Sequence, residues 1–274
     1  MGPIFIIAGK EVRDGLRNRW IIGATLVLAT LAFALALLGS APTGSLGVKP
    51  LAVTVVSLAS LSIFLVPLIA LLLSYDSIVG EAERGTLLLL LTYPLTRSQI
   101  LLGKVLGHCS ILAIATVLGY GGAGLAVGLT QGSDPQSWMA FAYLLLTSVM
   151  LGSAFVALAT LISLLVSERG TAAGIAVALW LVFVVLFDLL MLGLLVVGQG
   201  VVDPAAFRWL LALNPADVYR LANLTGFENI RMFSGMSGVA AEVRYPPGLL
   251  LSILAAWTVV PVGIALLLFR RREQ

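Results

Sequence analysis

The chain has 274 residues, of which 60% are hydrophobic and 11% are charged, and its net charge is +3. Soluble domains carry about 25% charged residues, so this composition excludes an ordinary soluble globule and indicates a protein of the lipid bilayer. The Lys and Arg residues flank apolar runs without interleaved aromatic residues, which disfavours a nucleic-acid partner and indicates membrane topology instead.

Ahead of the first long apolar run, residues 4–19 have the pattern of an amphipathic helix. At 100° per residue, apolar side chains fall on one side and charged ones on the other, although Ile6 and Ile7 break the pattern. This is typical of a helix in the membrane interface with its basic side near anionic headgroups, and a helical positive flank without that role is the alternative. The apolar side comprises Ile4, Phe5, Ala8, Val12, Leu16 and Trp20, and the polar side comprises Lys10, Arg13, Asp14, Arg17 and Asn18.

Six apolar runs are long enough to cross a membrane, and each is predicted to be an α-helix because lipid leaves a single segment no other way to satisfy its backbone. The shortest reaches roughly 27 Å at about 1.5 Å per residue, close to the hydrocarbon thickness of about 30 Å. The predicted fold is an all-α membrane protein with a single transmembrane domain over residues 1–274. The runs cover about residues 20–38, 51–74, 105–130, 138–166, 171–197 and 248–269.

The distribution of Lys and Arg predicts that both termini are cytoplasmic. With the N-terminus inside, eleven of these residues face the cytoplasm and five face the other side, four of them in one long external loop. A cleaved signal peptide is the competing interpretation of the first run, but its apolar region exceeds the usual length of about 7 to 15 residues.

Between the second and third runs, residues 76–104 form a charged segment punctuated by glycine and proline, DSIVGEAERGTLLLLLTYPLTRSQILLGK. Its run of five leucines is too short to cross a bilayer, so the segment must lie at the surface or fold against other helices. The stretch from Gly80 to Thr86 has the glycine spacing of a phosphate-binding loop but lacks its lysine. Neither a nucleotide site nor a catalytic arrangement around the single histidine is predicted.

Residues 167–170 join the fourth and fifth runs in a tight antiparallel hairpin. Further along the fifth run, Asp188 lies roughly 15 Å from the external end, where a carboxyl costs at least about 2.5 kcal/mol unless it is paired or hydrated. We therefore expect Asp188 to face the bundle interior or a subunit interface. Substrate handling and helix association both remain open as its role.

The loop of residues 198–247 is the one sizeable extramembrane region. Asp203 and Asn214 are each followed by proline, a pattern that predicts two short external helices near residues 205–213 and 216–224. The first carries apolar and aromatic residues that suggest a dip into the outer leaflet. The rest of the loop could present a docking surface.

Candidate metal ligands are few. His108 and Cys109 are adjacent, hence about 100° apart on a helix, which is poor geometry for one shared ion and favours a structural role. Met232 and Met236 are four residues apart and could share a face as soft ligands for Cu(I). Methionine also fills interfaces without any metal, so the two thioethers alone make a weak site.

Three pairs of glycines at a spacing of four would allow close approach of helices, and packing of a dimer is their natural use. The pairs are Gly103/Gly107, Gly124/Gly128 and Gly170/Gly174.

Three stretches resemble the permeases of ABC-2 type transporters: AGKEVRDGLRNRW at residues 8–20, the segment at residues 74–104, and LNPADVYRLANLTGFENIRMFSGMSGVA at residues 213–240. The first and last are similar to the branch of that family that serves the maturation of the copper centres of nitrous oxide reductase. The resemblance implies a non-catalytic homodimer in the bacterial inner membrane. It also implies two copies of a cytoplasmic ATPase that bind ATP and Mg, and a periplasmic partner of β-helix type, while this chain binds no cofactor.

The same resemblance assigns roles to individual residues. Contacts with the ATPase would be made by Glu81, Glu83, Arg84, Gly85, Thr86, Pro94, Glu168 and Arg169, and docking of the periplasmic partner by Asp203, Asn214, Pro215, Tyr219, Arg220 and Arg231. Two mechanisms stay open, transmission of mechanical work to the periplasmic partner and passage of a copper or sulfur species through the dimer. An ABC-2 exporter of a lipid, drug or glycan is the alternative function. An ATP-independent channel is disfavoured because we expect no broken helix with midplane charges.

Overall fold

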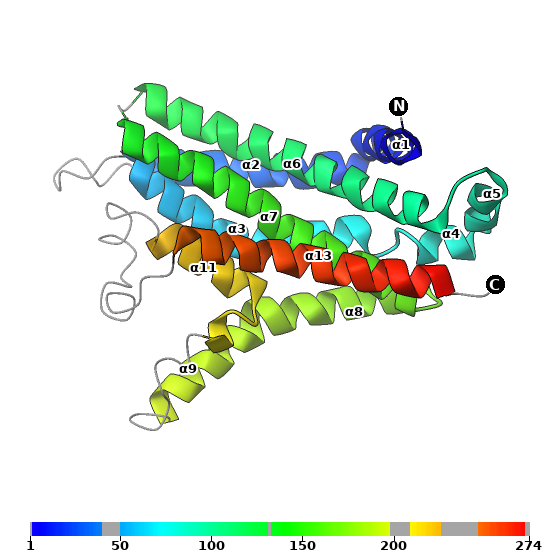
Figure 1. Cartoon of the computed structure of the whole chain (residues 1–274). Helices are drawn as coiled ribbons and strands as arrows, with labels where there is room; N and C mark the ends of the chain where they lie inside the picture. The colour runs from blue at the N-terminus through cyan, green and yellow to red at the C-terminus, as the bar shows by residue number, and fades with distance from the viewer. Residues whose placement is uncertain (1, 40–49, 131–132, 198–208, 226–245, 272–274) are drawn as a thin grey trace.

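The computed structural model describes residues 2–39, 50–130, 133–197, 209–225 and 246–271, and in these ranges the chain is a bundle of helices without a β-strand (Figure 1). The first helix, the short helices α4 and α5 and the last turn of α13 lie at the same end of the bundle. The elements are α1 (Pro3–Arg17), α2 (Arg19–Gly39), α3 (Pro50–Ser74), α4 (Val79–Glu83), α5 (Thr86–Thr92), α6 (Arg97–Thr130), α7 (Pro135–Leu165), α8 (Arg169–Leu181), the π-helix η2 (Val182–Leu186), α9 (Phe187–Val197), α11 (Pro215–Thr225) and α13 (Pro247–Arg271).

The predicted all-α membrane protein is confirmed. Among the described residues, five helical stretches are long and apolar enough to span a bilayer, and α2 makes a sixth when it is joined to α1, from which it is bent by 72°. The third span begins earlier than predicted, at Arg97, because Thr96 and Gln99 form a capping box. The amide of Gln99 donates to the Thr96 hydroxyl at 3.2 Å, and the amide of Thr96 donates to the Gln99 side chain at 2.9 Å.

Two helix starts in the bundle follow from local sequence. Asp134 is the N-cap of α7, where its carboxylate accepts the amide of Ser137, and Pro135 occupies the first helical position. At the start of α11, the side chain of Asn214 accepts the amide of Ala216 at 2.9 Å. Asparagine followed by proline therefore predicted the beginning of α11 correctly.

Helix α1 packs against α6 through small residues of α6. A Cβ on Gly103 would lie 2.6 Å from Cβ of Ile7, and one on Gly107 would lie 2.5 Å from Cβ of Glu11. This glycine pair thus serves packing within the chain, as does Gly124/Gly128, which faces aromatic rings of α7. Ile7, which breaks the predicted amphipathic pattern of α1, is buried on α6, whereas Phe5 and Leu16 of the predicted apolar side are exposed.

The core of the bundle is formed by α3, α6, α7 and α13, and α11 packs into it. Tyr219 and Val218 of α11 are fully buried. The short segment before α11 is held by Trp257 of α13, whose indole N–H donates to the carbonyl of Ala212 at 3.2 Å. Helix α11 is thus a re-entrant helix that folds back among the spans.

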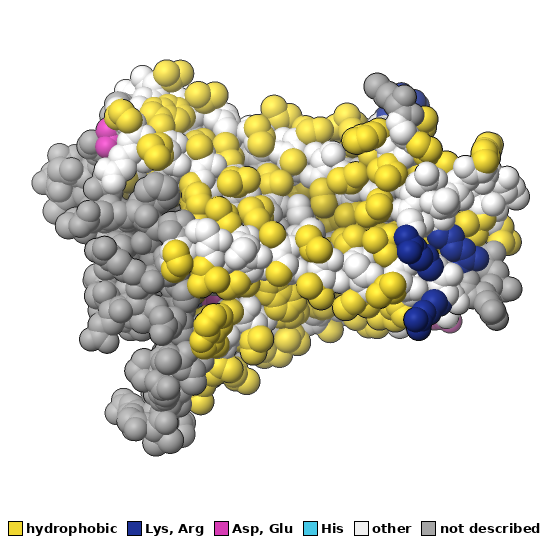
Figure 2. Space-filling model, in the orientation of Figure 1, with side chains coloured by type: hydrophobic (Ala, Val, Ile, Leu, Met, Phe, Trp, Pro, Cys, Tyr) yellow, Lys and Arg dark blue, Asp and Glu magenta, His cyan; other side chains and the backbone are white. Residues whose placement is uncertain are grey.

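The fifth span is the least enclosed. Only 17% of the most apolar window of Arg169–Leu194 is buried, and α9 diverges from the bundle (Figure 1). The direction changes at the π-helix η2, although the span stays helical without interruption from Arg169 to Leu194. The visible face carries an apolar belt along the bundle, with Lys and Arg gathered near α4, α5 and the end of α13 (Figure 2). We call this end of the bundle the basic end.

Candidate functional site

The segment between α3 and α6 folds into a compact corner at the basic end. Helix α4 ends at Glu83 with Arg84 as its C-cap, and Gly85 then adopts a φ of 71°, the one positive φ among the described residues. Glycine accepts this left-handed conformation without the penalty that a Cβ brings. The hydroxyl of Thr86 donates to the carbonyl of Glu81 at 3.2 Å and closes the corner between α4 and α5.

The start of α4 is anchored on α7 by Ser163. The Ser163 hydroxyl accepts hydrogen bonds from the amides of Ile78 and Val79, both at 3.0 Å and both buried. Amides at a helix start have no partner within the helix, so a side chain from another element must satisfy them. This anchor was not predicted, because a serine inside an apolar span gives no signal of a partner 85 residues away.

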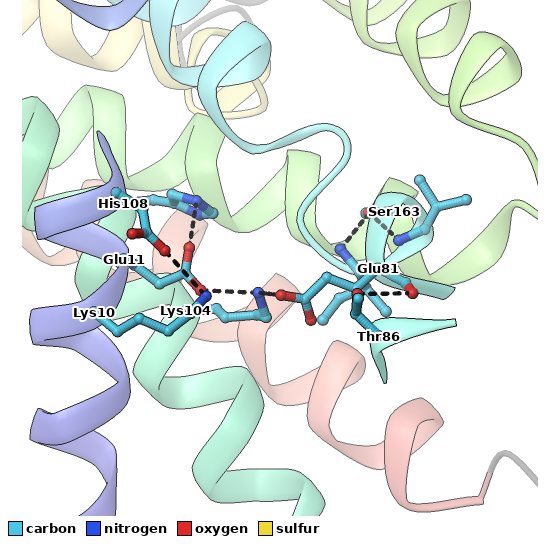
Figure 3. Close-up of polar contacts among 10 residues, drawn as sticks. Lys10, Glu11, Glu81, Thr86, Lys104, His108 and Ser163 are labelled. Atoms are coloured by element: carbon cyan, nitrogen blue, oxygen red, sulfur yellow. Dashed lines mark hydrogen bonds and ion pairs between the residues drawn. The ribbon is translucent and has the colours of Figure 1, made fainter. Parts of the chain in front are cut away.

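Lys104 of α6 is the centre of a buried ion-pair network (Figure 3). Its ammonium lies 2.7 Å from Oε1 of Glu81 and 3.0 Å from Oε1 of Glu11, and only 3% of its side chain is exposed. Burial alone would raise the pKa of the Glu11 carboxyl, but Lys104, together with His108 and Lys10, outweighs burial and the pKa is lowered. The carboxylate of Glu11 is therefore ionised at neutral pH.

This network changes the interpretation of Glu81. The carboxylate was expected to meet a partner protein, but it is turned into the protein and bound to Lys104. Glu81 thus connects α4 to α6 and, through Glu11, to α1, so its place is inside the corner rather than on its surface.

The two predicted ATPase-contacting elements are joined directly. The amide of Arg169, the first residue of α8, donates to Oε1 of Glu83 at 2.7 Å. The guanidinium of the same arginine donates to Oδ2 of Asp76 at 2.7 Å. Glu168 is the residue that precedes α8 and is exposed. The corner and the 167–170 turn therefore form one surface.

Helix α5 has an inner and an outer side. Leu87 is buried, and Leu90 and Leu91 pack against the core. Leu88 is 58% exposed, and Leu89 and Tyr93 are each 64% exposed. We call these three side chains the α5 surface; Arg84, Gly85, Thr86 and Pro94 beside it are also exposed.

A second polar site lies deeper in the bundle, where Asp188 meets Arg220. The guanidinium donates to Oδ1 of Asp188 at 3.0 Å and to Oδ2 at 2.6 Å, and it also donates to Oδ1 of Asp217 at 2.7 Å. Asn214 donates to Oδ2 of Asp217 at 3.0 Å and to the carbonyl of Phe183 in η2 at 2.8 Å. The cluster joins the π-helix to α11.

Residues expected to dock a periplasmic partner are largely inside the protein. Asn214, Pro215 and Tyr219 are buried, and the Tyr219 hydroxyl is hydrogen-bonded to Ser148 at 2.9 Å. Their assignment to an exposed surface was wrong, because α11 folds into the bundle instead of lying outside it. Arg220 is half-buried and engaged with Asp188. The remaining residues of these predictions, Asp203, Arg231, Met232 and Met236, lie outside the described residues.

His108 and Cys109 point toward different elements. Nε2 of His108 lies 3.8 Å from Oε2 of Glu11 on α1, whereas Cys109 interacts with Ser153 on α7. Within the described ranges no group of three His, Cys, Asp or Glu side chains could hold a metal ion.

Comparison with known proteins covers the whole bundle. The profile of the ABC-2 family transporter proteins matches residues 5–274. Two relatives, each called "Probable ABC transporter permease protein NosY", come from Stutzerimonas stutzeri and Pseudomonas aeruginosa. Each is 47% identical over 274 residues, which cover 99% of this chain and 99% of the relative. The similarity therefore runs from α1 to the end of α13.

Proposed function

Since this chain belongs to the ABC-2 family of transporter proteins, we propose that it is the permease through which a separate cytoplasmic ATPase drives maturation of the copper centres of nitrous oxide reductase. The relatives named NosY, similar over 99% of the chain, support the assignment to this process. In this proposal ATP and Mg bind to the ATPase, and the basic end of the bundle faces the cytoplasm of a bacterial cell.

The α5 surface is the observation that carries the coupling role. Leu88, Leu89 and Tyr93 are exposed, and they follow the exposed charged residues Glu83 and Arg84 in the chain, at the end of the bundle where α5 lies (Figure 1). An apolar cluster rimmed by charge is typical of a site for another protein. Among the residues first assigned to the ATPase, Glu83, Arg84, Pro94 and Glu168 remain exposed candidates, whereas Glu81 supports the surface from inside.

The corner is built to pass movement into the bundle. Ser163 ties it to α7, Lys104 ties it to α6 and α1, and Arg169 ties it to α8. Closure of the ATPase pair against α5 would therefore displace several helices together. We favour transmission of work to a periplasmic partner of β-helix type over passage of a solute, because the spans carry few polar side chains, and Ser62 and Tyr120, for example, are hydrogen-bonded to one another.

The proposed permease is a homodimer. Along α8, Gly170, Gly174 and Ala178 are exposed at a spacing of four residues, and a Cβ on either glycine would meet no atom within 4 Å. Small residues in this pattern let two helices approach closely in a membrane. This stripe is the surface through which we expect the second copy to pack.

Copurification of the ATPase tests the coupling role. The double variant Leu88→Asp/Leu89→Asp should lose the ATPase in a pull-down while the permease keeps its elution volume and yield, since both side chains point away from the core. Arg13→Gln, an exposed change on α1, is the matched control and should retain the ATPase. Full copurification with the double variant would refute the assignment.

Maturation of the client enzyme distinguishes the proposal from an exporter of a lipid, drug or glycan. The same double variant should leave nitrous oxide reductase with a depleted copper centre, measured by metal content of the purified enzyme. A normal copper content in cells that lack the permease would favour the exporter.

A further inference from the structure

Two carboxylates share one guanidinium where α11 meets the fifth span. Nη1 of Arg220 donates to Oδ1 of Asp188 at 3.0 Å and to Oδ1 of Asp217 at 2.7 Å, so both oxygens lie against the same nitrogen. Nη2 of Arg220 donates to Oδ2 of Asp188 at 2.6 Å. If both acids were ionised, the three side chains together would carry one negative charge in excess.

The elements packed against α11 supply no cation that could offset this charge. Helices α3 and α7 and the π-helix η2 contain no charged residue, and the charged residues of α13 are Arg270 and Arg271 in its last turn, at the basic end. Among the described residues, the charged groups that act on Asp217 are therefore Arg220 and Asp188. The other titratable groups are phenols, which are neutral near pH 7. These phenols are Tyr219 of α11, Tyr143 of α7 and Tyr120 of α6.

An uncompensated charge would be poorly solvated at this place. The side chain of Asp217 is 4% exposed and that of Arg220 is 24% exposed, and α11 lies among the spans. A buried carboxyl without a counter-charge binds a proton rather than remain ionised. The first turn of α11 favours an ionised Asp217, but this effect of a helix start is small beside the burial of an unpaired charge.

The geometry indicates which of the two acids is protonated. Asp188 binds both terminal nitrogens of the guanidinium and is 34% exposed, which favours its ionised form. Asp217 meets only Nη1, and its Oδ2 accepts from the neutral amide of Asn214 at 3.0 Å. Burial raises the pKa of the Asp217 carboxyl to about 7, against the opposing charge of Arg220 and with a further rise from Asp188.

The two acids are also hydrogen-bonding partners of one another. Two ionised carboxylates have no donor between them, so a hydrogen bond that joins them requires one to be protonated. A proton on Asp217 therefore satisfies the charge balance and this contact together.

We propose that Asp188 and Asp217 hold one bound proton between them, carried by Asp217, and that its release loosens the start of α11 from the fifth span. With the proton in place, Arg220 faces a single negative charge, and Asp217 is a neutral hydrogen-bonding partner. Without it, two carboxylates compete for one guanidinium and repel one another. This proton site concerns how α11 is held and is independent of the proposed function.

The direction of the pH effect follows from the raised pKa. The docked form of α11 binds a proton that the released form loses, because Asp217 in the released form has its ordinary pKa of 3.8. The docked form is therefore destabilised as the pH rises from about 3.8 to about 7, and no further above that. The equilibrium constant for opening of α11 should increase about tenfold per pH unit between about pH 5 and 7.

Hydrogen exchange of the full-length chain in detergent measures this opening. Amides of residues 218–225 are followed from pH 5 to pH 8 after correction for the intrinsic pH dependence of exchange, with α7 as the internal reference. Asp217→Asn, which resembles the neutral acid, should keep α11 docked and remove the pH dependence. Asp14→Asn, an exposed change on α1, is the matched control and should behave as the wild type. A pH-independent wild type between pH 5 and 7, or release of α11 in Asp217→Asn at pH 5, would overturn the proposal.

Infrared spectroscopy detects the proton directly and works on the wild type without any variant. The band of a protonated carboxyl should be present at pH 6, fade as the pH rises through about 7, and be absent from Asp217→Asn. Asp188→Asn should lose the band as well, because Asp217 then faces Arg220 without a competing carboxylate. Persistence of the full band in Asp217→Asn, or its absence from the wild type at pH 6, would each refute the site.

Arg208 provides a test for a cation from outside the described residues, since it precedes Asn214 closely in the sequence. Arg208→Gln should leave the infrared band and the exchange of α11 unchanged. A band that appears only in Arg208→Gln would show that an arginine takes the place of the proton in the wild type, and this result would also overturn the proposal.

Discussion

Arg220 of the re-entrant helix holds Asp188 of the fifth span through two parallel hydrogen bonds, of 3.0 and 2.6 Å, although the two residues are 32 positions apart. Bidentate pairing of this kind fixes orientation as well as distance. The one acid that stands deep in a span is thus compensated by a helix that enters the bundle from the loop beyond it.

Removing one partner of this pair should destabilise the protein. Loss of one side of a buried ion pair lowers the free energy of unfolding by about 3–5 kcal/mol. Because the Asp188 side chain is 34% exposed, we expect this free energy to fall by about 1–3 kcal/mol for Asp188→Leu and by less for Asp188→Asn. The melting temperature in detergent measures the loss. Combined with Arg220→Gln, the Asn variant should lose less than the sum of the single changes, and strict additivity would contradict the pairing. A stable but inactive Asp188→Asn protein would instead assign the carboxylate to cation or proton binding.

Glu81 and Glu83 should respond differently to charge reversal, although they are two residues apart. Glu81→Lys places a second ammonium beside Lys104, whose side chain is 3% exposed, so we expect little folded protein. Glu83→Lys loses one exposed contact to the amide of Arg169 and should cost less than about 1 kcal/mol. Yield and monodispersity on size exclusion are the measurements, and Glu168→Lys is the exposed control. Equal yields for both variants would disprove the buried role of Glu81.

Gly85 should be sensitive to any side chain even though nothing crowds it. A Cβ there would meet no atom within 4 Å, but the φ of 71° costs an L-residue about 1–2 kcal/mol. Gly85→Ala should therefore speed hydrogen exchange in α5, and Gly85→Asn should do so less. Gly9→Ala, in the helical interior of α1 with open space around it, is the control and should leave α5 unchanged.

The small stripe on α8 should lie close to its copy in the proposed dimer. In a Cys109→Ser background, Ala178→Cys should form an oxidised dimer in membranes, whereas Leu118→Cys on the exposed side of α6 should not. Gly174→Leu should lower the dimer fraction with little loss of monomer stability, since a Cβ at this position meets no atom of its own chain within 4 Å. Cross-linking confined to Leu118→Cys would contradict this arrangement.

Acid should release α1 from α6. The folded-state pKa of Glu11 is lowered, so its contribution is complete above the ordinary value of 4.5 and is lost as the pH falls through the lowered pKa. Limited proteolysis near residue 18 in detergent should therefore accelerate below pH 4.5 and not between pH 6 and 8. Glu11→Gln should be cleaved readily and without this pH dependence; a wild-type profile for that variant would refute the role of Glu11.

Length and hydropathy were sufficient to predict the spans, because a helix in lipid needs little information beyond a long apolar run. Helix capping could also be predicted from the sequence, as at Asn214 before α11. The position of α11 inside the bundle could not be predicted, since its burial depends on partners such as Ser148, which is 71 residues from Tyr219 in the sequence. The apolar or polar character of one helix does not determine which other helix it packs against.

The sequence predicted where the corner lies, but it did not predict which residues hold the corner in place. Charged residues between two spans were interpreted as surface, which holds for Glu83 and Arg84 and fails for Glu81. Lys104 stands at the edge of an apolar stretch, and this position indicates only the boundary of the segment. The available signal for a buried ion pair was a lysine at the start of a predicted span, close enough to two glutamates to pair with them. Ile7 likewise breaks the amphipathic pattern predicted for α1, although it is the residue that packs against Gly103.

The π-helix at Val182–Leu186 sets the rotational phase between the two halves of the fifth span. A π-turn holds one residue more than an α-turn, so if the same residues formed a regular α-helix throughout, everything beyond this point would be turned by roughly 100°. Asp188 would then swing away from Arg220, and the carbonyl of Phe183 would re-enter the helix ladder instead of accepting Asn214. One inserted residue is thus enough to aim a carboxylate out of the lipid and toward the helix that neutralises it.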